Sequence, residues 1–330
     1  MTDLLLSPHN DDEALFASYI ALRERPKVIV CLLGGRKKDY PLPTERAAES
    51  RTAMRILGCE FEQLWFACDP AQWDLVELRL REEPEPDRVW VPTPEPGGHS
   101  HHNKLARVAH DIWPGKLSYY STYRCEETGW PVRTTHGHPV NVDPAWPTLK
   151  RQALDCYRTQ IARAGTRMHF ERSLDEYEAV GLRLNLGGGI NPIAGFVNLD
   201  RSTGWRFETG LTDYATGSVE AITVSHALMY VAVEEWPFVF GEMARVLDSG
   251  GIIRITEDAI GAAGSSRPSI RPRAAVATSA DLVLEHLHAA GLPGRVVAPD
   301  ETSFRDGSLI QQNYGAPPDV FHVEASADPL

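Results

Sequence analysis

The feature that most constrains the fold is a regular alternation of apolar, strand-like runs with helix-like runs. In the first half, strands are expected at residues 4–6, 27–33, 60–66 and 88–92, and helices at 14–22, 44–57, 71–82, 104–113 and 147–164. The alternation starts again with strands at 182–186, 196–199, 219–225 and 252–256, and helices at 236–247 and 281–290. Such alternation favours mostly parallel sheets with ligand sites at the carboxyl ends of the strands. We therefore expect two tandem α/β domains, residues 1–178 and 179–330.

Composition narrows the classes of function. The net charge of −12 argues against bulk nucleic-acid binding, which needs a basic surface. No run reaches the roughly 18 apolar residues of a membrane span, and the first residues lack a secretory-signal pattern. The cysteines favour buried thiols in a reducing cytoplasm, because they are scattered, odd in number and never spaced as C-x-x-C: Cys31, Cys59, Cys68, Cys125 and Cys156. The sequence leaves oligomeric assembly open.

Two polar clusters follow expected strands of the first domain. The run SPHNDDE after the first strand contains His9, Asp11 and Asp12, and the run HSHH contains His99, His101 and His102. Imidazole nitrogens and carboxylate oxygens are the ligands of zinc-type metals, and three ligands with an open position describe a catalytic site. Taken alone, the two aspartates are equally typical of a capped helix start.

These clusters give the first half a resemblance to the PIG-L/LmbE-like family of zinc-dependent N-deacetylases. The matching segments are 9–13 (HNDDE), 99–102 (HSHH) and the helices at 45–58 and 146–160, so the resemblance spans about residues 1–180. It implies that His9, Asp12 and His102 bind Zn²⁺ or another divalent metal. The chain departs from the family pattern at Asn10, where proline is usual, and at His101, where aspartate is usual.

The same resemblance implies catalytic roles. Asp11 would be the general base that takes a proton from the attacking water, and His99, as an imidazolium, would donate to the oxyanion. Arg46 would contact a substrate hydroxyl or phosphate. His101 would compete for the metal, and the carboxylate that usually orients the oxyanion donor is missing. Two other histidines, His136 and His138, are expected to lie in a surface loop.

A glycine-rich turn opens the second half. Gly187, Gly188 and Gly189 follow an apolar strand, and Asp200 ends the next one. Glycines there permit close approach of the backbone to a ligand, and a carboxylate in that place can accept both ribose hydroxyls. Such a turn alone is a weak signal, and it fits a nicotinamide cofactor as well.

Several longer strings resemble class I S-adenosylmethionine-dependent methyltransferases. They are NLGGGINPIAGFVNLD (185–200), GSVEAITVSHALMYV (217–231), EMARVLDSGGIIRI (242–255) and VFHVEA (320–325), which looks like a last edge strand. The resemblance covers about 182–326 and favours S-adenosylmethionine over a nicotinamide. It implies two Rossmann-like domains in tandem, with Gly187 to Gly189 under the methionine end of the cofactor, Asp200 at the ribose and Glu208 near the adenine.

Residues beyond the cofactor turn are candidates for the substrate cleft of this second domain. They are His226, Tyr230 and Glu257, with residues 261–273 as a substrate lid. Relatives often show Glu-His where this chain has Met229-Tyr230.

The sequence therefore predicts a bifunctional enzyme. One half would hydrolyse an N-acyl group, typically N-acetyl, on an amino sugar or glycosylated metabolite, and the other would methylate, with the released amine as a candidate acceptor. Two alternatives stay open: a deacetylase with a non-catalytic cofactor-binding or docking half, and a methyltransferase whose metal domain serves recognition.

Overall fold

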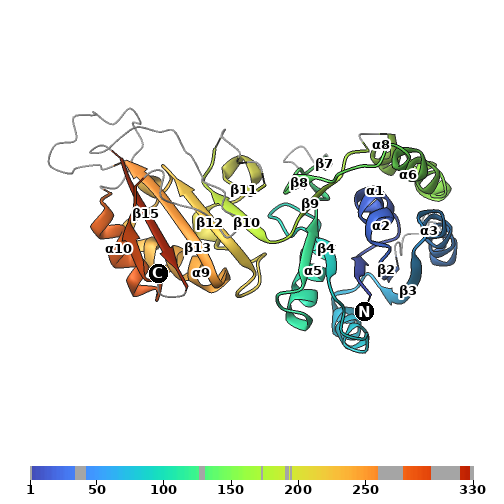
Figure 1. Ribbon diagram of the computed structural model, residues 1–330, viewed down its shortest axis with the longest axis horizontal. Coiled ribbons are helices and arrows are strands. Elements are labelled where there is room, and N and C mark those ends of the chain that lie inside the picture. Colours follow the sequence, from blue (N-terminus) through green and yellow to red (C-terminus); the bar gives the residue numbers. More distant parts are fainter. Residues whose placement is uncertain are drawn as a thin grey trace. The chain divides into compact units, whose positions relative to one another are not determined.

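The chain folds into two compact units, Met1–Val180 and Gly181–Leu330, in the computed structural model (Figure 1). The structure describes residues 2–33, 42–125, 131–171, 174–189, 193, 195–258, 278–298 and 320–327. Each unit is built on one large sheet, mostly parallel and flanked by helices, so the predicted fold class is confirmed. The lid predicted at 261–273 lies outside the described residues.

Unit 1 is built on a seven-stranded sheet in the order β3-β2-β1-β4-β5-β9-β8. The strands are β1 (Leu4–Ser7), β2 (Lys27–Leu33), β3 (Glu60–Ala67), β4 (Val89–Pro92), β5 (Leu117–Tyr120), β8 (His138–Pro139) and β9 (Tyr177–Ala179). The first five in that order run parallel, and β9 and β8 are antiparallel additions at one side. A separate hairpin pairs β6 (Tyr123–Cys125) with β7 (Pro131–Arg133).

Helices cover both faces of this sheet. They are α1 (Asp12–Phe16), α2 (Ser18–Glu24), α3 (Pro43–Leu57), α4 (Trp73–Leu80, after the 3₁₀ turn Pro70–Gln72), α5 (Ser100–Ile112), α6 (Trp146–Leu154), α7 (Arg158–Ile161) and α8 (Ala164–Glu171). The first three and α6 pack together on one face, while α4 and α5 pack on the other, as right-handed crossovers require (Figure 1). The strands β1 and β2 are consequently buried on both faces, which explains their unbroken apolar sequences.

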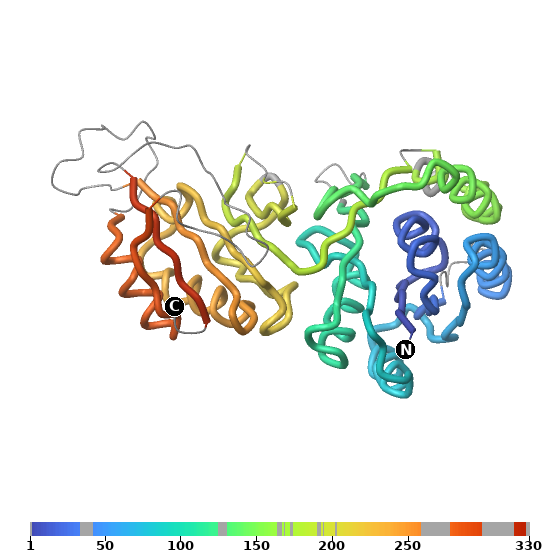
Figure 2. The backbone as a smooth tube through the Cα atoms, in the orientation of Figure 1, coloured from blue at the N-terminus to red at the C-terminus, as the bar shows by residue number. Residues whose placement is uncertain are grey.

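Two predicted helices of unit 1 are interrupted. The helix expected at 14–22 is divided into α1 and α2 at Ala17, whose φ of −137° is not helical. The helix expected at 147–164 is divided between α6 and α7 near Tyr157, which has non-helical ψ of 55°. Figure 2 shows the chain passing from β1 directly into the first of these short helices, the blue segment next to the N-terminus. That connection carries the first polar cluster.

Unit 2 has a six-stranded sheet in the order β11-β10-β12-β13-β15-β14. The strands are β10 (Leu182–Leu186), β11 (Val197–Leu199), β12 (Val219–Ser225), β13 (Leu247–Asp258), β14 (Gly294–Val296) and β15 (Val320–Ser326). The strands β11, β10, β12 and β13 are parallel, and β15 runs antiparallel between β13 and β14. The prediction of β15 as an edge strand is therefore wrong: β14 covers its outer side, and β15 is buried along most of its length.

Two helices of unit 2 pack against each other, α9 (Trp236–Val246) and α10 (Ala280–Ala289). Trp236 and Phe240 are fully buried, and the ring of His286 from α10 lies 5.3 and 5.9 Å from theirs. Short 3₁₀ turns occupy Arg201–Thr203, Phe207–Thr209, Leu228–Tyr230 and Val233–Glu235. Residues 248–251 form an irregularity inside β13, because Val219 of β12 pairs with Leu247 while Ala221 pairs with Ile252.

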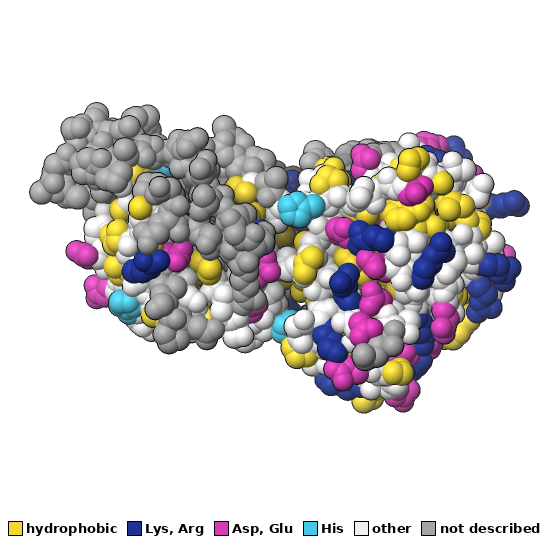
Figure 3. Space-filling model, viewed as in Figure 1, with side chains coloured by type: hydrophobic (Ala, Val, Ile, Leu, Met, Phe, Trp, Pro, Cys, Tyr) yellow, Lys and Arg dark blue, Asp and Glu magenta, His cyan; other side chains and the backbone are white. Residues whose placement is uncertain are grey.

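The charge distribution on the surface and the lengths of the helices bear on nucleic acids and membranes as partners. The face of unit 1 seen in Figure 3 mixes basic and acidic side chains rather than gathering the basic ones in one place. Among the described residues, no helix combines the length and the apolar character that crossing a bilayer requires.

Candidate metal centre and cofactor-binding edge

The polar clusters of unit 1 meet at the carboxyl-terminal edge of its parallel strands. His9 follows β1, the histidines 99 to 102 follow β4 and begin α5, and Cys68 follows β3. Because β3, β2, β1 and β4 run parallel in that order, the loops after these strands open at one edge. The sheet thus brings His9 within 2.8 Å of His101, 92 positions away in the sequence.

Asp12 stands between two of the predicted metal ligands. Its Oδ2 lies 3.1 Å from Nδ1 of His9 and 3.1 Å from Nε2 of His102. Burial alone would raise the pKa of Asp12, but His102 and His9 outweigh it and hold the pKa well below its usual value. His102 is buried, and Thr122 holds its other nitrogen at 3.0 Å, as outer-sphere partners do for metal-binding imidazoles.

The donor set fits a divalent cation of the zinc type. His9, His99 and His102 each offer one nitrogen, and these atoms lie within 4.8 Å of one another. The carboxylate of Asp12 contacts two of the three imidazoles. Nitrogen and oxygen donors converging from three loops or helix ends, partly shielded from water, are what a catalytic zinc site requires.

Asp11 combines a strained backbone with a buried carboxyl group whose pKa is raised. It precedes α1 with φ of 110°, a rare value for a non-glycine residue, and its side chain makes no capping hydrogen bond to the helix. Its Oδ2 lies 3.4 Å from Arg46. Burial raises the pKa of Asp11 well above its usual value, with Asp12 adding to the shift and Arg46 opposing it. A raised pKa suits a general base working near neutral pH.

His99 forms the N-cap of α5. Its Nδ1 accepts the backbone N–H of His101 at 3.2 Å, so the hydrogen-bond pattern assigns the ring proton to Nε2. Burial, followed by the repulsion of His9 and His102, lowers the pKa of His99 to about 3. The side chain is therefore arranged as a neutral N–H donor rather than the imidazolium expected from the sequence.

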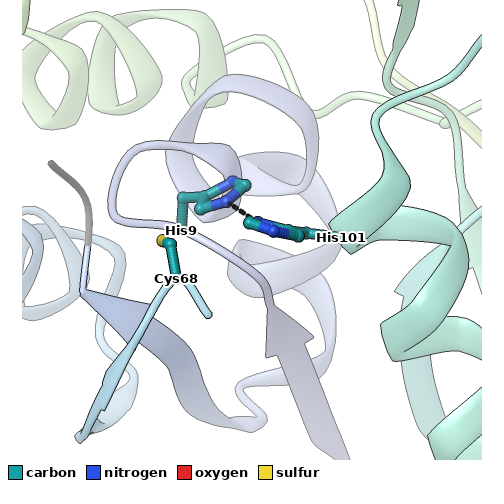
Figure 4. Close-up of side chains that lie close together, drawn as sticks. All are labelled: His9, Cys68 and His101. Carbon is teal, nitrogen blue, oxygen red and sulfur yellow. Dashed lines mark hydrogen bonds between the residues drawn. The ribbon is translucent and has the colours of Figure 1, made fainter. Parts of the chain in front are cut away.

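His101 and Cys68 form a second group around His9. Nε2 of His9 faces Nδ1 of His101, and the ring centroids of Trp73 and His101 are 5.9 Å apart. His9, Cys68 and His101 also offer one ligand atom each within 4.8 Å (Figure 4). The sequence reasoning missed Cys68, because a lone cysteine carries no spacing signal. Its position directly after a predicted strand was the available indication.

Buried polar residues hold the loop after β1 in shape. The amide of Asn10 donates to Ser50 Oγ at 3.0 Å and to Gln63 Oε1 at 2.6 Å. Arg46, 5% exposed, donates to the backbone oxygen of Asn10. Glu13 accepts the Tyr157 hydroxyl at 2.6 Å and the backbone N–H of the neighbouring Asp11 at 3.1 Å. The guanidinium predicted to touch substrate is thus engaged with the loop itself.

The two histidines near β8 differ in environment. His138 is exposed, but His136 is buried, and its Nε2 lies 2.6 Å from Glu95 in the segment that leads to His99. The surface-loop prediction is wrong for His136. Its partner lies 41 positions away, so no local pattern could have identified the pair.

The glycine-rich turn of unit 2 requires glycine at its first position. Gly187 has φ of 73°, and a Cβ there would lie 2.4 Å from the Cβ of Ala227. Gly189 also has positive φ, 57°, with no atom within 4 Å of a Cβ built on it, and a Cβ on Gly188 would meet Asn185 at 2.3 Å. Neighbouring side chains thus exclude a Cβ at Gly187 and Gly188, whereas Gly189 leaves its backbone open to a ligand.

Asp200 and Glu208 lie in short turns after β11. Asp200 is buried, and its Oδ1 accepts the N–H of Thr203 at 3.2 Å, so the carboxylate also caps a 3₁₀ turn. Glu208 is exposed. Since β10 and β11 are parallel and paired at Leu186 and Leu199, Asp200 and the glycine turn share one edge of the sheet.

The same edge carries the substrate candidates after β12. His226 has φ of 49°, and its Nδ1 lies 3.3 Å from the Asp258 carboxylate at the end of β13. Glu257 is fully buried and accepts the N–H groups of Ala227 and Leu228, both at 2.7 Å, so it shapes the loop. Tyr230 is 38% exposed.

Comparison with known proteins gives matches only among solved structures, since no family model and no curated protein matches. A triple-mutant deacetylase of the teicoplanin biosynthetic pathway is 17% identical, over 52% of this chain and 88% of that chain, with TM-score 0.41. A conserved protein from Thermus thermophilus is 21% identical, over 51% and 84%, with TM-score 0.38. A SAM-dependent methyltransferase from Archaeoglobus fulgidus is 12% identical, over 44% and 86%, with TM-score 0.33. The chain is thus similar to both kinds of enzyme, each over about half of its length.

Proposed function

We propose that the chain is a bifunctional enzyme, a metal-dependent N-deacylase in its first unit and a SAM-dependent methyltransferase in its second. The observation that carries the first activity is Asp12 lying 3.1 Å from both His9 and His102, preceded in the chain by Asp11 with its strained backbone. A zinc-type cation held by His9, Asp12 and His102 would activate water and polarise an amide carbonyl.

The residues around that set have complementary tasks. Asp11 takes the proton of the attacking water and returns it to the leaving amine, a role supported by its raised pKa. His99 donates its Nε2 proton as a hydrogen bond to the oxyanion, a role supported by the acceptor function of its Nδ1. Arg46 holds the loop and its charge lies next to Asp11, so it limits how far the pKa of that carboxyl rises.

The second activity is supported by the glycine turn and its edge. Gly187 to Gly189 would receive the methionine end of S-adenosylmethionine, Asp200 the ribose and Glu208 the adenine. The cofactor would supply an activated methyl group, and orientation of the acceptor does most of the remaining work. His226 and Tyr230 lie on the loop after β12, where an acceptor would enter.

We further propose that the two reactions act in sequence on one small molecule. Hydrolysis of an N-acyl group on an amino sugar, or on a glycosylated metabolite, releases an amine, and an amine is a nucleophile that a methyl donor can alkylate without strong acid–base help. This order is a hypothesis about coupling, separate from the two activities.

Mass spectrometry of products tests the first activity. The wild-type protein should release acetate from members of a panel of N-acetylated sugars and sugar conjugates. The rate of that release should fall at least about a hundredfold in Asp11→Asn. Asp74→Asn, which changes an exposed aspartate of α4, is the matched control and should keep the wild-type rate. A chelated protein that still hydrolyses the panel would refute metal dependence.

The second activity and the order of steps need separate measurements. Titration with S-adenosylmethionine should show binding that survives Asp11→Asn, and the absence of binding would favour a docking role for unit 2. If Asp11→Asn cannot deacetylate but still methylates the N-acetylated compound, the sequential order fails. If stoichiometric metal and hydrolysis are both absent, the metal unit serves recognition only.

A further inference from the structure

The imidazole of His9 faces two different groups with its two nitrogens. Nδ1 lies 3.1 Å from Asp12, on the side of the proposed catalytic set. Nε2 lies 2.8 Å from Nδ1 of His101 (Figure 4). The ring therefore belongs to two potential ligand sets: it contacts Asp12 through one nitrogen and His101 through the other.

The second set has the composition of a cation site. Cys68 follows β3, His9 follows β1 and His101 lies in the first turn of α5, so three separate segments bring one ligand atom each to within 4.8 Å. None of the three side chains is exposed. The Sγ of Cys68 donates to the Leu33 carbonyl at 2.9 Å, which fixes the thiol at the end of the sheet. A thiolate with two imidazoles is a donor set that favours soft or borderline cations.

We propose that Cys68, His101 and His9 form a second cation site, which takes thiophilic metals and competes with the His9–Asp12–His102 set for His9. Binding there releases the thiol proton to solvent and ends the hydrogen bond to Leu33. The competitive element rests on the proposed function, because it assumes a cation in the first set.

The competition follows from the chemistry of one neutral imidazole. Such a ring has a single in-plane lone pair and a single N–H. A cation on Nε2 places the proton on Nδ1, where it donates to Asp12. A cation on Nδ1 places the proton on Nε2, where it donates to His101. The two sets therefore exclude each other while His9 stays neutral.

Spectroscopy with Co²⁺ alone tests the site without any enzyme assay. Thiolate–Co²⁺ charge transfer absorbs in the near ultraviolet, whereas imidazole and carboxylate ligands give no such band. The full-length wild-type chain, freed of metal, should show this band, and Cys68→Ser should lose it. Cys156→Ser, which alters another partly buried cysteine at the end of α6, is the matched control and should keep the band.

Two further variants separate the site from the competition. His101→Ala should weaken Co²⁺ binding, measured by the band, by at least about tenfold, since a lost ligand costs no less than a lost outer-sphere partner. His102→Ala, which weakens only the competing set, should retain the band and shift its half-saturation to lower Co²⁺. A wild-type chain with no band, or a band unchanged in Cys68→Ser, overturns the site, and an unshifted half-saturation in His102→Ala overturns the competition. A wild-type chain that shows the band but no deacylase activity would refute the proposed function and leave the second cation site standing.

Discussion

A buried ion pair behind the candidate metal centre gives the sharpest test of the fold. Lys150 of α6 is 1% exposed, and its Nζ donates to Glu176 at 2.5 Å and to the carbonyls of Leu15 and Leu174 at 3.1 and 3.0 Å. The other oxygen of Glu176 accepts the backbone N–H of Tyr19 at 2.8 Å. The pair thus fastens α1 and α2, which follow the loop after β1, to α6 and to the segment before β9.

Lys150→Met should destabilise unit 1 by about 3–5 kcal/mol, because it leaves the Glu176 carboxylate buried without its cation. The double variant Lys150→Met with Glu176→Gln should lose less free energy of unfolding than the two single variants lose together. We expect a coupling of about 2 kcal/mol, because no uncompensated charge remains in the double variant. Glutamine keeps an acceptor for the Tyr19 N–H.

Urea unfolding followed by hydrogen exchange of individual peptides is the assay. Peptides from α1 and α6 should exchange at lower urea in Lys150→Met, while peptides from α9 in unit 2 serve as the internal reference. Lys116→Met is the matched control, because Lys116 makes an equally short contact, 2.5 Å to Glu85, but on the surface. It should leave the midpoint of unit 1 close to that of the wild type.

Two results would refute this reasoning. If Lys150→Met shifts the midpoint no more than Lys116→Met, the Lys150–Glu176 pair is not desolvated in solution. If the double variant costs the full sum of the single variants, the two side chains do not act as a pair, and the loss must come from packing of the lysine stem instead.

Two further predictions follow from single residues. Gly187→Ala should lower the free energy of unfolding by about 2–4 kcal/mol, because the added Cβ collides with Ala227 and the residue keeps a positive φ. The same variant should show no S-adenosylmethionine binding by calorimetry. The control Gly217→Ala, with φ of 68° and open space around its Cβ, should lower the free energy of unfolding by only about 1 kcal/mol. Asn10→Ala should lower the free energy of unfolding by about 1–3 kcal/mol, since it leaves buried partners on α3 and β3 without a donor.

The fold was largely accessible from the sequence because its signals are local. The strand expected at 27–33 coincides with β2, and the restart at 182–186 coincides with β10. The predictions of helix ends and strand order failed where contacts between residues far apart in the sequence determine them. No glycine or proline marks the break near Tyr157, whose buried hydroxyl reaches Glu13, 144 positions away. The inner position of β15 likewise depends on β14, whose three residues carry no strand pattern of their own.

The site was accessible only in part, for the same reason. Residue type and position after a strand indicated the two polar clusters, and the family resemblance singled out His9, Asp12 and His102. The sheet does bring these side chains together. The sequence marked Asn10 only as a departure from the usual proline. Its side chain ties the loop to α3 and β3, a role that depends on two partners 40 and 53 positions away. Cys68 was read as an ordinary thiol because its neighbours in space come from other strands.

Helix capping and function are not alternatives at this site. The sequence left open whether Asp11 and Asp12 merely cap α1, yet Asp11 makes no capping hydrogen bond and keeps a strained backbone. His99 does cap α5, and doing so commits its Nδ1 and leaves Nε2 as the donor. Asp200 caps a 3₁₀ turn with one oxygen. A capping bond that fixes one atom of a side chain orients the remaining one, and fixed orientation is what a catalytic or cofactor-binding group needs. A capping residue at the carboxyl edge of a parallel sheet is therefore a stronger functional candidate than one elsewhere.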